Sequence, residues 1–521
     1  MEIGKFILGT KPREYQERIA KTAYNKNTLV VLPTGMGKTL IALMLAIERM
    51  QKFPQSKVVF LAPTRPLASQ HLSYFRKHLP ELFASMELFT GKIKAEKRKE
   101  LWQKADIIFS TPQCVANDVR NNLYTLEDVS LLVEDECHRC LKNYDYVYVV
   151  QKYLKQAKTA RVLGLTASPG NDAKTINEIC KNLGIEAIEI RHRESEDVKP
   201  YLQKLTTEII RVDLPPEFVR IRDTLNKIYT KKIEELKNRK LLFGPATKKT
   251  LLELQHRIMA AVSSGNRHFN FLAGASACAQ AIKLQHALEL IETQGLFAFH
   301  KYMKDLFEQA KQGKSRAVKQ LVKSAEFNRA YISTTELLAS EQEHPKLTRL
   351  KEIVEKIIEE KRNAKIIVFA QYRDTVTRIC KELNSIEGIN ARVFIGQAMK
   401  DGEGGKGLSQ KEQQEIIKDF SLGLINILCA TSIGEEGLDL PEVSYVIFYE
   451  PIPSAIRKIQ RAGRTARLKP GKLIILVTRK TRDEAYHYAS LAKERKMHGI
   501  LKDMHDKLAE KKKQKSIKDF L

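Results

Sequence analysis

Short apolar runs rich in β-branched residues alternate with longer stretches of helical periodicity in the N-terminal part of the chain. Because a run that is apolar at every position suits a strand buried on both faces, this alternation predicts a parallel sheet covered by helices on either side. The predicted strands lie at residues 29–32, 58–61, 107–109, 131–133 and 162–165. We therefore predict an α/β domain over residues 1–205.

The pattern then becomes almost wholly helical. Leu251, Leu254 and Ile258 recur at the spacing of one helix face, and comparable β-branched runs are lacking. We therefore predict an all-helical domain inserted at residues 206–344. Its polar stretches, such as residues 311–316, are basic, and they either form a solvated face or contact nucleic acid.

Alternation of strands and helices resumes in the C-terminal part and predicts a second α/β domain over residues 345–488. The glycine-rich segment 401–407 predicts a flexible loop, and the lysine-rich residues 489–521 predict a basic tail that is either helical or disordered. The predicted strands lie at residues 366–369, 392–395, 425–428, 445–448 and 473–477.

The net charge of the chain indicates which binding partners to consider, and its lack of targeting signals indicates the cellular compartment. The 521 residues carry 89 Lys and Arg against 62 Asp and Glu, a formal net charge of +27. This excess makes a polyanion such as nucleic acid the first partner to consider, although lysines also form ordinary solvated surfaces. The N-terminus lacks a secretion signal, and no apolar run approaches the roughly 20 residues that cross a bilayer. We therefore expect no membrane contact, and a cytosolic, nuclear or prokaryotic cytoplasmic location.

A glycine-containing loop follows the first predicted strand and leads into an apolar helix. Its glycines allow backbone N–H groups and the helix N-terminus to face phosphates. Lys38 is placed to reach the β- and γ-phosphates and Thr39 to ligate Mg²⁺, so the sequence predicts an ATP and Mg²⁺ site. The loop consists of Pro33, Thr34, Gly35, Met36, Gly37, Lys38 and Thr39.

An acidic pair follows the predicted strand 131–133. Asp135 is placed to hold Mg²⁺ through water, and Glu136 to orient or deprotonate the attacking water. Together with the upstream phosphate loop, which contributes Lys38 to catalysis, this pair predicts nucleotide hydrolysis.

The segment Asp135-Glu136-Cys137-His138 resembles the signature of the superfamily 2 helicases, and the other sequence blocks of that superfamily occur in order. The resemblance implies a fold of two RecA-like parallel-sheet motor domains. It implies that Arg13 and Gln16 contact the nucleotide, with Gln16 reading the adenine edge, and that residues 166–168 link hydrolysis to domain movement. The residues implied to grip nucleic-acid phosphates in the first domain are Thr64, Arg65, Thr111 and Pro112.

The second domain supplies the residues that the first one lacks. Arg464 and Arg467 lie three residues apart, so on a helix they share a face and can both reach a γ-phosphate across a cleft, as catalytic arginine fingers do. The resemblance implies further contacts, to the nucleotide by Gly437, Asp439 and Gln460, and to nucleic acid by Gln371, Thr431 and Gly434.

The helical insert narrows the resemblance to the helicase part of the archaeal Hef and Fanconi anaemia group M family. This implies an ATP-dependent DNA helicase or translocase that acts on replication forks and Holliday junctions in DNA repair and fork restart. It also favours a prokaryotic, archaeal cytoplasm with association to the nucleoid. The nuclease centre of Hef is not matched, because Ile500 stands where that centre needs Asp, so we expect no nuclease activity.

Two other functions fit the same blocks. A double-stranded-RNA helicase or sensor of the RIG-I and Dicer type also places helices between its motor domains, and contacts to phosphates do not distinguish ribose from deoxyribose. Because no RNA-end-binding domain follows, we expect DNA. The other alternative is a clamp-recruited scaffold with a regulatory ATPase. It rests on a C-terminal resemblance to sliding-clamp docking peptides, carried by Gln514, Ile517, Phe520 and Leu521.

Overall fold

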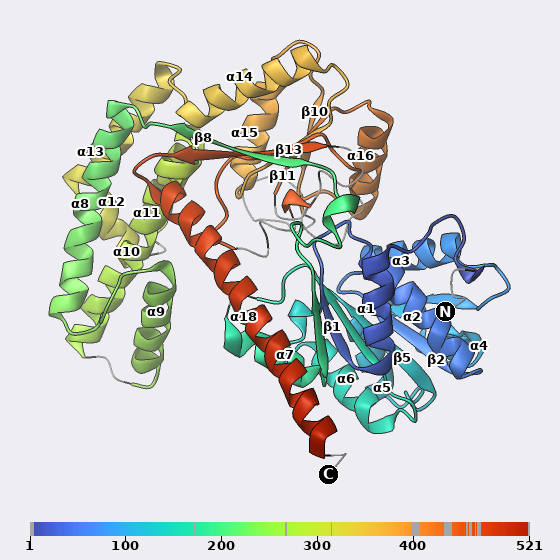
Figure 1. Ribbon diagram of the computed structural model, residues 1–521. Coiled ribbons are helices and arrows are strands. Elements are labelled where there is room, and N and C mark those ends of the chain that lie inside the picture. Colours follow the sequence, from blue (N-terminus) through green and yellow to red (C-terminus); the bar gives the residue numbers. More distant parts are fainter. Residues whose placement is uncertain are drawn as a thin grey trace.

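The chain forms two parallel sheets, a helical body between them in sequence, and a long C-terminal helix (Figure 1). This computed structural model describes residues 5–170, 172–265, 268–313, 315–396, 407–431, 440–454, 457, 461–463, 465 and 470–518, with side chains as far as residue 507. Among these residues, no helix has both the length and the apolar character that a membrane span requires.

The first sheet has seven parallel strands in the order β3-β4-β2-β5-β6-β1-β7. Leu29 and Val31 point into the core on one face, whereas Val30 points into the core on the other face, which explains why the strand is apolar at every position. The strands are β1 (Thr28–Val31), β2 (Lys57–Leu61), β3 (Met86–Phe89), β4 (Ile107–Ser110), β5 (Val129–Asp135), β6 (Val162–Thr166) and β7 (Ala187–Ile190).

Helices cover both faces of this sheet. Those on one face include α1 (Glu14–Asn25), α2 (Lys38–Lys52) and α3 (Arg65–His78). The opposite face and its edge are covered by α4 (Ala95–Lys104), α5 (Pro112–Arg120), α6 (Asp145–Gln156) and α7 (Ala173–Asn182).

The second sheet has six parallel strands in the order β10-β11-β9-β12-β13-β8. Its strands are β8 (Leu205–Val212), β9 (Ile366–Phe369), β10 (Ala391–Phe394), β11 (Ile427–Ala430), β12 (Tyr445–Phe448) and β13 (Gly471–Thr478). Its helices are α14 (Pro345–Glu360), α15 (Arg373–Leu383) and α16 (Gln410–Leu422). Residues 401–406, predicted as a loop, lie outside the described part of the chain.

The predicted boundary at residue 206 needs correction. Strand β8 was assigned to the helical insert, yet it pairs with β13 along its whole length, from Leu205 beside Gly471 to Val212 beside Thr478. It lies at the sheet edge, and Thr206 and Thr207 are exposed. An edge strand of this kind lacks the continuous apolar run by which the other strands were predicted.

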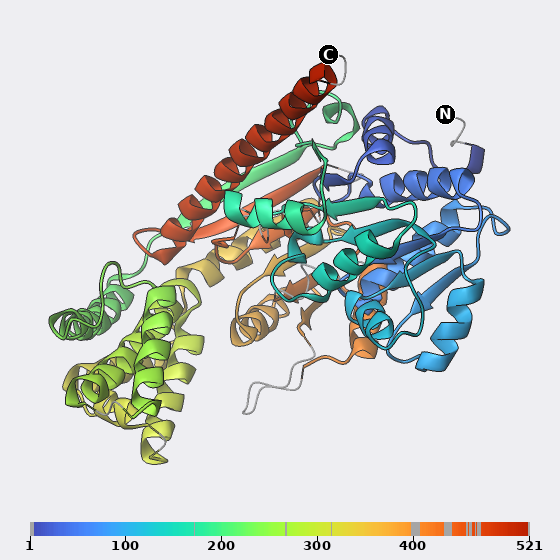
Figure 2. The same cartoon turned by 90° about the horizontal axis from the view of Figure 1, so that it is seen from below.

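The insert is all-helical from Pro216 onward, and Figure 2 shows it as a body to one side of the two sheets. It has two buried clusters, in which α10 packs against α8 and α11 in one and against α8 and α9 in the other. Its helices are α8 (Pro216–Asn238), α9 (Lys248–Ser263), α10 (Phe269–Thr293), α11 (Leu296–Lys311), α12 (Arg316–Val322) and α13 (Ala325–Ala339).

Residues 489–518 of the predicted basic tail, for which both a helix and disorder were expected as alternatives, belong to the C-terminal helix α18 (Arg482–Lys518). It leaves β13 and runs alongside the first domain in both views (Figures 1 and 2). Met497 and Leu501 are buried in that domain's core, and His505 Nδ1 donates to the carbonyl of Ile188 at 2.7 Å. Helix α18 therefore connects the second domain to the first.

Candidate nucleotide and nucleic-acid site

The phosphate loop, residues 33–39, turns sharply between β1 and α2. Gly35 and Gly37 have φ angles of +82° and +75°, a left-handed conformation that disfavours other residues. A Cβ atom on Gly37 would lie 2.2 Å from Nε2 of Gln16, so this side of the loop has no room for a side chain. Helix α2 begins at Lys38, and its positive N-terminus faces the loop. The loop therefore has the form of a phosphate cradle.

Helix α1 braces this loop through the carbonyl of Met36. The hydroxyl of Tyr15 donates to that carbonyl at 2.8 Å, and Nε2 of Gln16 donates to it at 3.2 Å. The backbone N–H of Arg13 donates to Oε1 of Gln16 at 2.9 Å, and the Arg13 guanidinium stacks on the ring of Tyr201. Gln16 is thus buried against the loop with its amide engaged, and adenine recognition by Gln16 and Arg13 stays a prediction.

The predicted Mg²⁺ ligands Thr39 and Asp135 both lie within hydrogen-bond distance of the imidazole of His71. His71 Nε2 lies 2.8 Å from Oδ2 of Asp135, and His71 Nδ1 lies 3.4 Å from Oγ1 of Thr39. Burial by itself would raise the pKa of Asp135, but the hydrogen bond from His71, with the charge of Lys38, lowers it below its ordinary value. An ionised carboxylate and a hydroxyl are hard oxygen donors, so these residues fit Mg²⁺.

Lys38 points its ammonium back to the strand, where Nζ donates to the carbonyl of Leu32 at 3.1 Å. The group is partly buried beside the cradle rather than extended into solvent. A polyanion bound on the loop would offer it stronger, charge-assisted hydrogen bonds than this single carbonyl does.

A chain of contacts leads from the second acidic residue to α18. Glu136 has a φ of +50°, and its Oε2 lies 3.3 Å from Nδ1 of His138. That nitrogen lies 3.3 Å from Oγ1 of Thr166, which in turn accepts the N–H of Ser168 at 3.1 Å. The Ser168 hydroxyl contacts Sδ of Met497 at 2.8 Å. The block 166–168 therefore joins the acidic pair to the C-terminal helix.

The predicted phosphate-gripping residues of the first domain lie side by side. Strands β2 and β4 are paired, with Leu61 beside Ser110, and Thr64 and Thr111 follow their carboxyl ends as N-caps of α3 and α5. Neither side chain caps its own helix, and Oγ1 of Thr64 is buried without a hydrogen-bond partner in the described part of the chain. The N-termini of α3 and α5 are therefore adjacent, and Arg65 and Pro112 are the first residues of these two helices.

The second domain repeats this arrangement at β9 and β11. These strands are paired, with Phe369 beside Ala430. Gln371 and Thr431 follow them at the same edge, Gln371 exposed and Thr431 mostly buried.

Several predicted residues lie outside the described part of the chain: Gly434, Gly437, Asp439, Gln460, Arg464, Arg467, Phe520 and Leu521, with the side chains of Gln514 and Ile517. Their neighbours are informative. A pocket of about 290 Å³ is lined by Pro33 and Thr34 of the phosphate loop and by Ala462 and Gly463 of the second domain. The segment preceding Arg464 therefore shares a pocket with the phosphate loop, and Met497 of α18 lines the same pocket.

Sequence reasoning missed His71 and Met497. Both lie on helices far along the chain from the motifs that they contact, and neither belongs to a recognisable motif. Only the folded structure brings them to the site.

Three known protein families match consecutive parts of the chain. The DEAD/DEAH box helicase family matches residues 13–176, and the helicase conserved C-terminal domain matches residues 346–469. Between them, a helical bundle described as that of a putative ATP-dependent RNA helicase matches residues 217–344.

Named relatives cover nearly the whole chain. It is 40% identical to a putative ATP-dependent RNA helicase of Methanocaldococcus jannaschii, over 94% of this chain and 61% of that protein. It is 32% identical to the ATP-dependent DNA helicase fml1 of Schizosaccharomyces pombe, over 90% of this chain and 57% of that protein. It is also 32% identical to the Fanconi anemia group M protein homolog of Mus musculus, over 91% of this chain and 25% of that protein. The chain thus spans from a quarter to about three fifths of these relatives' length.

A solved structure extends the match to three dimensions. The helicase domain of Pyrococcus furiosus Hef superposes with a TM-score of 0.71 at 43% identity, covering 92% of this chain and 98% of that one. The match confirms the predicted pair of RecA-like sheets with a helical body between them. The chain therefore belongs to the Hef and Fanconi anaemia group M family of ATP-dependent superfamily 2 helicases.

Proposed function

We propose that this protein is an ATP-driven DNA helicase or translocase that acts on branched DNA, namely replication forks and Holliday junctions, in repair and fork restart. The observation that carries the proposal is the match of all three parts, helical insert included, to the Hef helicase domain, together with relatives named as DNA helicases. The basic net charge of +27 agrees with a polyanionic substrate.

In the proposed cycle, ATP binds on the phosphate loop and Lys38 moves from the Leu32 carbonyl to the β- and γ-phosphates. Thr39 and Asp135 would hold Mg²⁺, which neutralises charge on the transferred phosphoryl group. Glu136 orients or deprotonates the attacking water. Arg464 and Arg467 approach from the second domain, with further nucleotide contacts by Gly437, Asp439 and Gln460. Closing and reopening of the cleft then follows the state of the nucleotide.

The proposed DNA path crosses the paired loops of both domains. In the first, the N-termini of α3 and α5 offer Thr64, Arg65, Thr111 and Pro112 to backbone phosphates, and the unpartnered Thr64 hydroxyl supports this role. In the second, the path continues over Gln371, Thr431 and Gly434. Because these groups contact phosphates, binding should depend on salt and structure more than on sequence.

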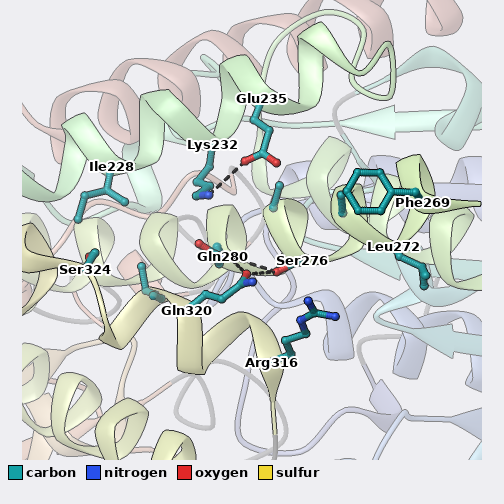
Figure 3. Close-up of a pocket in the computed structure, with 13 residues that line it drawn as sticks. Ile228, Lys232, Glu235, Phe269, Leu272, Ser276, Gln280, Arg316, Gln320 and Ser324 are labelled. Atoms are coloured by element: carbon teal, nitrogen blue, oxygen red, sulfur yellow. Dashed lines mark hydrogen bonds and ion pairs between the residues drawn. The ribbon is translucent and has the colours of Figure 1, made fainter.

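A groove on the insert supports a second DNA contact. It has a volume of about 460 Å³ and lies between α8, α10 and α12 (Figure 3). Phe269 is 75% exposed at its rim, and the guanidinium of Arg239 lies 6.0 Å from that ring. Arg316 also lines the groove. An exposed aromatic ring beside cations suits an unpaired base and its phosphate.

Three polar side chains that line this groove bond to one another. The Ser276 hydroxyl donates to Oε1 of Gln320 at 2.8 Å, and Nε2 of Gln280 donates to the same oxygen at 3.0 Å (Figure 3). Amide groups of this kind can exchange hydrogen bonds with a base edge. We assign the groove to the unpaired part of a branched substrate.

Double-stranded RNA is the second candidate substrate, because the Methanocaldococcus relative and the matching helical bundle are both described as those of an RNA helicase. A clamp-recruited scaffold is a third candidate, through Gln514, Ile517, Phe520 and Leu521. The proposed location is the archaeal cytoplasm, at the nucleoid.

The test measures ATP hydrolysis with single-stranded DNA, forked DNA, four-way junctions and double-stranded RNA as separate stimulants. We expect forks and junctions to stimulate most. Stimulation by RNA alone would replace the DNA proposal with the RNA candidate, and no stimulation by any of them would favour the scaffold. Deletion of residues 514–521 should weaken clamp binding without changing hydrolysis, and unchanged clamp affinity would remove the docking peptide.

A further inference from the structure

His71 lies between the two oxygen groups that would hold Mg²⁺, although none of the sequence blocks named above contains it. It belongs to α3 and is 6% exposed. Its ring packs against Phe60 with the ring centroids 4.4 Å apart, which fixes the plane of the imidazole. Both ring nitrogens are therefore held at defined positions.

The two hydrogen bonds of His71 determine each other. The Asp135 carboxylate can only accept, so Nε2, 2.8 Å away, carries the ring proton. In the tautomer that carries its proton on Nε2, the lone pair of Nδ1 faces the Thr39 hydroxyl at 3.4 Å. The hydroxyl proton is thereby directed to the ring, which leaves the lone pairs of the Thr39 oxygen available to a cation. The imidazole of His71 thus orients both the Asp135 carboxylate, which accepts a hydrogen bond from it, and the Thr39 hydroxyl, which donates one to it.

We propose that His71 is a positioning residue for the divalent cation of the nucleotide, acting through Thr39 and Asp135. The inference rests on the proposed ATP and Mg²⁺ site. Groups that hydrogen-bond to metal ligands fix the orientation of those ligands, and their loss typically costs about 10- to 100-fold in metal affinity. A histidine that merely filled the core would also need hydrogen-bond partners, but backbone groups would serve, as the Leu8 carbonyl does for His78; the partners of His71 are instead the two predicted Mg²⁺ ligands.

The experiment measures ADP affinity by titration calorimetry, once with Mg²⁺ and once with EDTA. His71→Phe keeps an aromatic ring against Phe60 but can neither donate nor accept. We expect it to lose about 10- to 100-fold of the gain in ADP affinity that Mg²⁺ provides. Its ADP affinity in EDTA should equal that of the wild type. His71→Gln retains an amide donor, so it should recover a large part of the Mg²⁺ effect.

His78 provides the matched control. It is buried on the same helix, but its Nδ1 donates to the Leu8 carbonyl at 2.7 Å, away from the site. His78→Phe should leave the Mg²⁺ effect unchanged.

Three outcomes would overturn the inference. A full Mg²⁺ effect in His71→Phe would show that the imidazole is dispensable for the cation. Loss of ADP binding in EDTA as well would assign His71 a role in holding the loop. Absence of any Mg²⁺ effect in the wild type would instead count against the proposed nucleotide site, and the role of His71 would be lost with it.

Discussion

His344 is fully buried where the helical insert joins the second domain. Its Nδ1 accepts the backbone N–H of Lys346 at 3.2 Å, and its Nε2 donates to the carbonyl of Glu292 at 3.3 Å. Burial lowers the pKa of His344 well below its ordinary value of 6.5, and the charge of Lys346 lowers it further. The folded protein therefore keeps this ring neutral at a pH where the unfolded chain protonates it.

Because the folded-state pKa is depressed, the unfolded chain binds one more proton than the folded protein below about pH 6.5. The free energy of unfolding should therefore fall by about 1.4 kcal/mol for each pH unit below that value, from this group alone. Urea denaturation over a series of pH values measures the slope. His344→Asn keeps a helix-capping acceptor that does not titrate, so its slope should be smaller, and equal slopes would contradict the prediction.

Lys38 carries the sharpest prediction about activity. Lys38→Ala removes the cation that the phosphate loop places against the β- and γ-phosphates, so ATP hydrolysis should be abolished. DNA affinity should be retained, because Thr64 and Thr111 lie on other loops. Lys21→Ala, an exposed change on α1, serves as the control in both assays. Wild-type turnover by Lys38→Ala would refute the site.

At the residue scale, a site residue could be predicted where the neighbouring sequence alone fixes its position. Lys38 and Thr39 are recognisable because they end the short glycine-containing loop that follows strand β1, and Asp135 because it ends strand β5, so the local chain positions each of them. His71 is not recognisable, because a histidine on the buried face of a helix has the same local pattern wherever that helix packs. Its role appears only when α3 covers the end of β5.

The paired helix N-termini of α3 and α5 give a prediction at the element scale. Thr64→Ala and Thr111→Ala should each cost about 1 kcal/mol of DNA binding, roughly fivefold in Kd, because each removes one hydrogen bond to phosphate. The dependence of Kd on salt should keep its slope, since no charge is lost. Fluorescence anisotropy with forked DNA measures both quantities.

Ser73 supplies the control for these two variants, because it lies exposed on α3 and bonds to the Ser69 carbonyl of its own helix. Ser73→Ala should bind DNA like the wild type. Unchanged affinity in a Thr64→Ala, Thr111→Ala double variant would remove these helix termini from the proposed DNA path.

The groove of the insert can be tested with two exposed phenylalanines. Phe269, at the groove, is 75% exposed, and Phe243, which is not among the residues lining it, is 73% exposed. Phe269→Ala should weaken binding of forks with unpaired arms by about 1–3 kcal/mol, the worth of stacking one base. Phe243→Ala should not, and neither variant should change binding of a fully paired duplex. Equal losses in both variants would argue against a specific groove contact.

Elements were predicted well where burial on both faces gave the strand a continuous apolar run of three or more residues, as in β1, β2, β5 and β9. Strand β8 was not predicted, because a strand at the edge of a sheet does not need a continuous run of apolar residues. The docking of helix α18 on the first domain was not predicted, because its residues are largely basic and the apolar positions that dock it, Met497 and Leu501, are too sparse to predict a packing partner. In both cases the position of the element depends on tertiary contacts with residues far away in the sequence, which the local pattern does not indicate.

At the scale of the whole molecule, α18 is held at two places, at its start and near its middle. At its start, Asp483 and Lys346 form an ion pair of 2.8 Å in which neither side chain is exposed, and Lys346 also donates to the Thr293 carbonyl at the end of α10. Breaking such a buried pair by removing one partner is strongly destabilising. The middle of α18 is held by Met497 and Leu501 in the core of the first domain. Relative movement of the two motor domains must therefore move or release one of these two attachments.

The attachment at Met497 and Leu501 should release first, because it consists of apolar contacts and the His505 hydrogen bond, whereas the start of α18 is held by the buried ion pair. Met497→Ala removes a side chain that is 1% exposed, a change that typically costs about 2–5 kcal/mol in a core. We expect this cost to appear as local undocking of α18 rather than as global unfolding. Hydrogen–deuterium exchange should therefore accelerate around residues 493–507 and stay slow in β1 and β6. Lys502→Ala, exposed on the same helix, should leave exchange unchanged. Undiminished protection of residues 493–507 in Met497→Ala would mean that other contacts hold the helix, and that domain movement has to begin elsewhere.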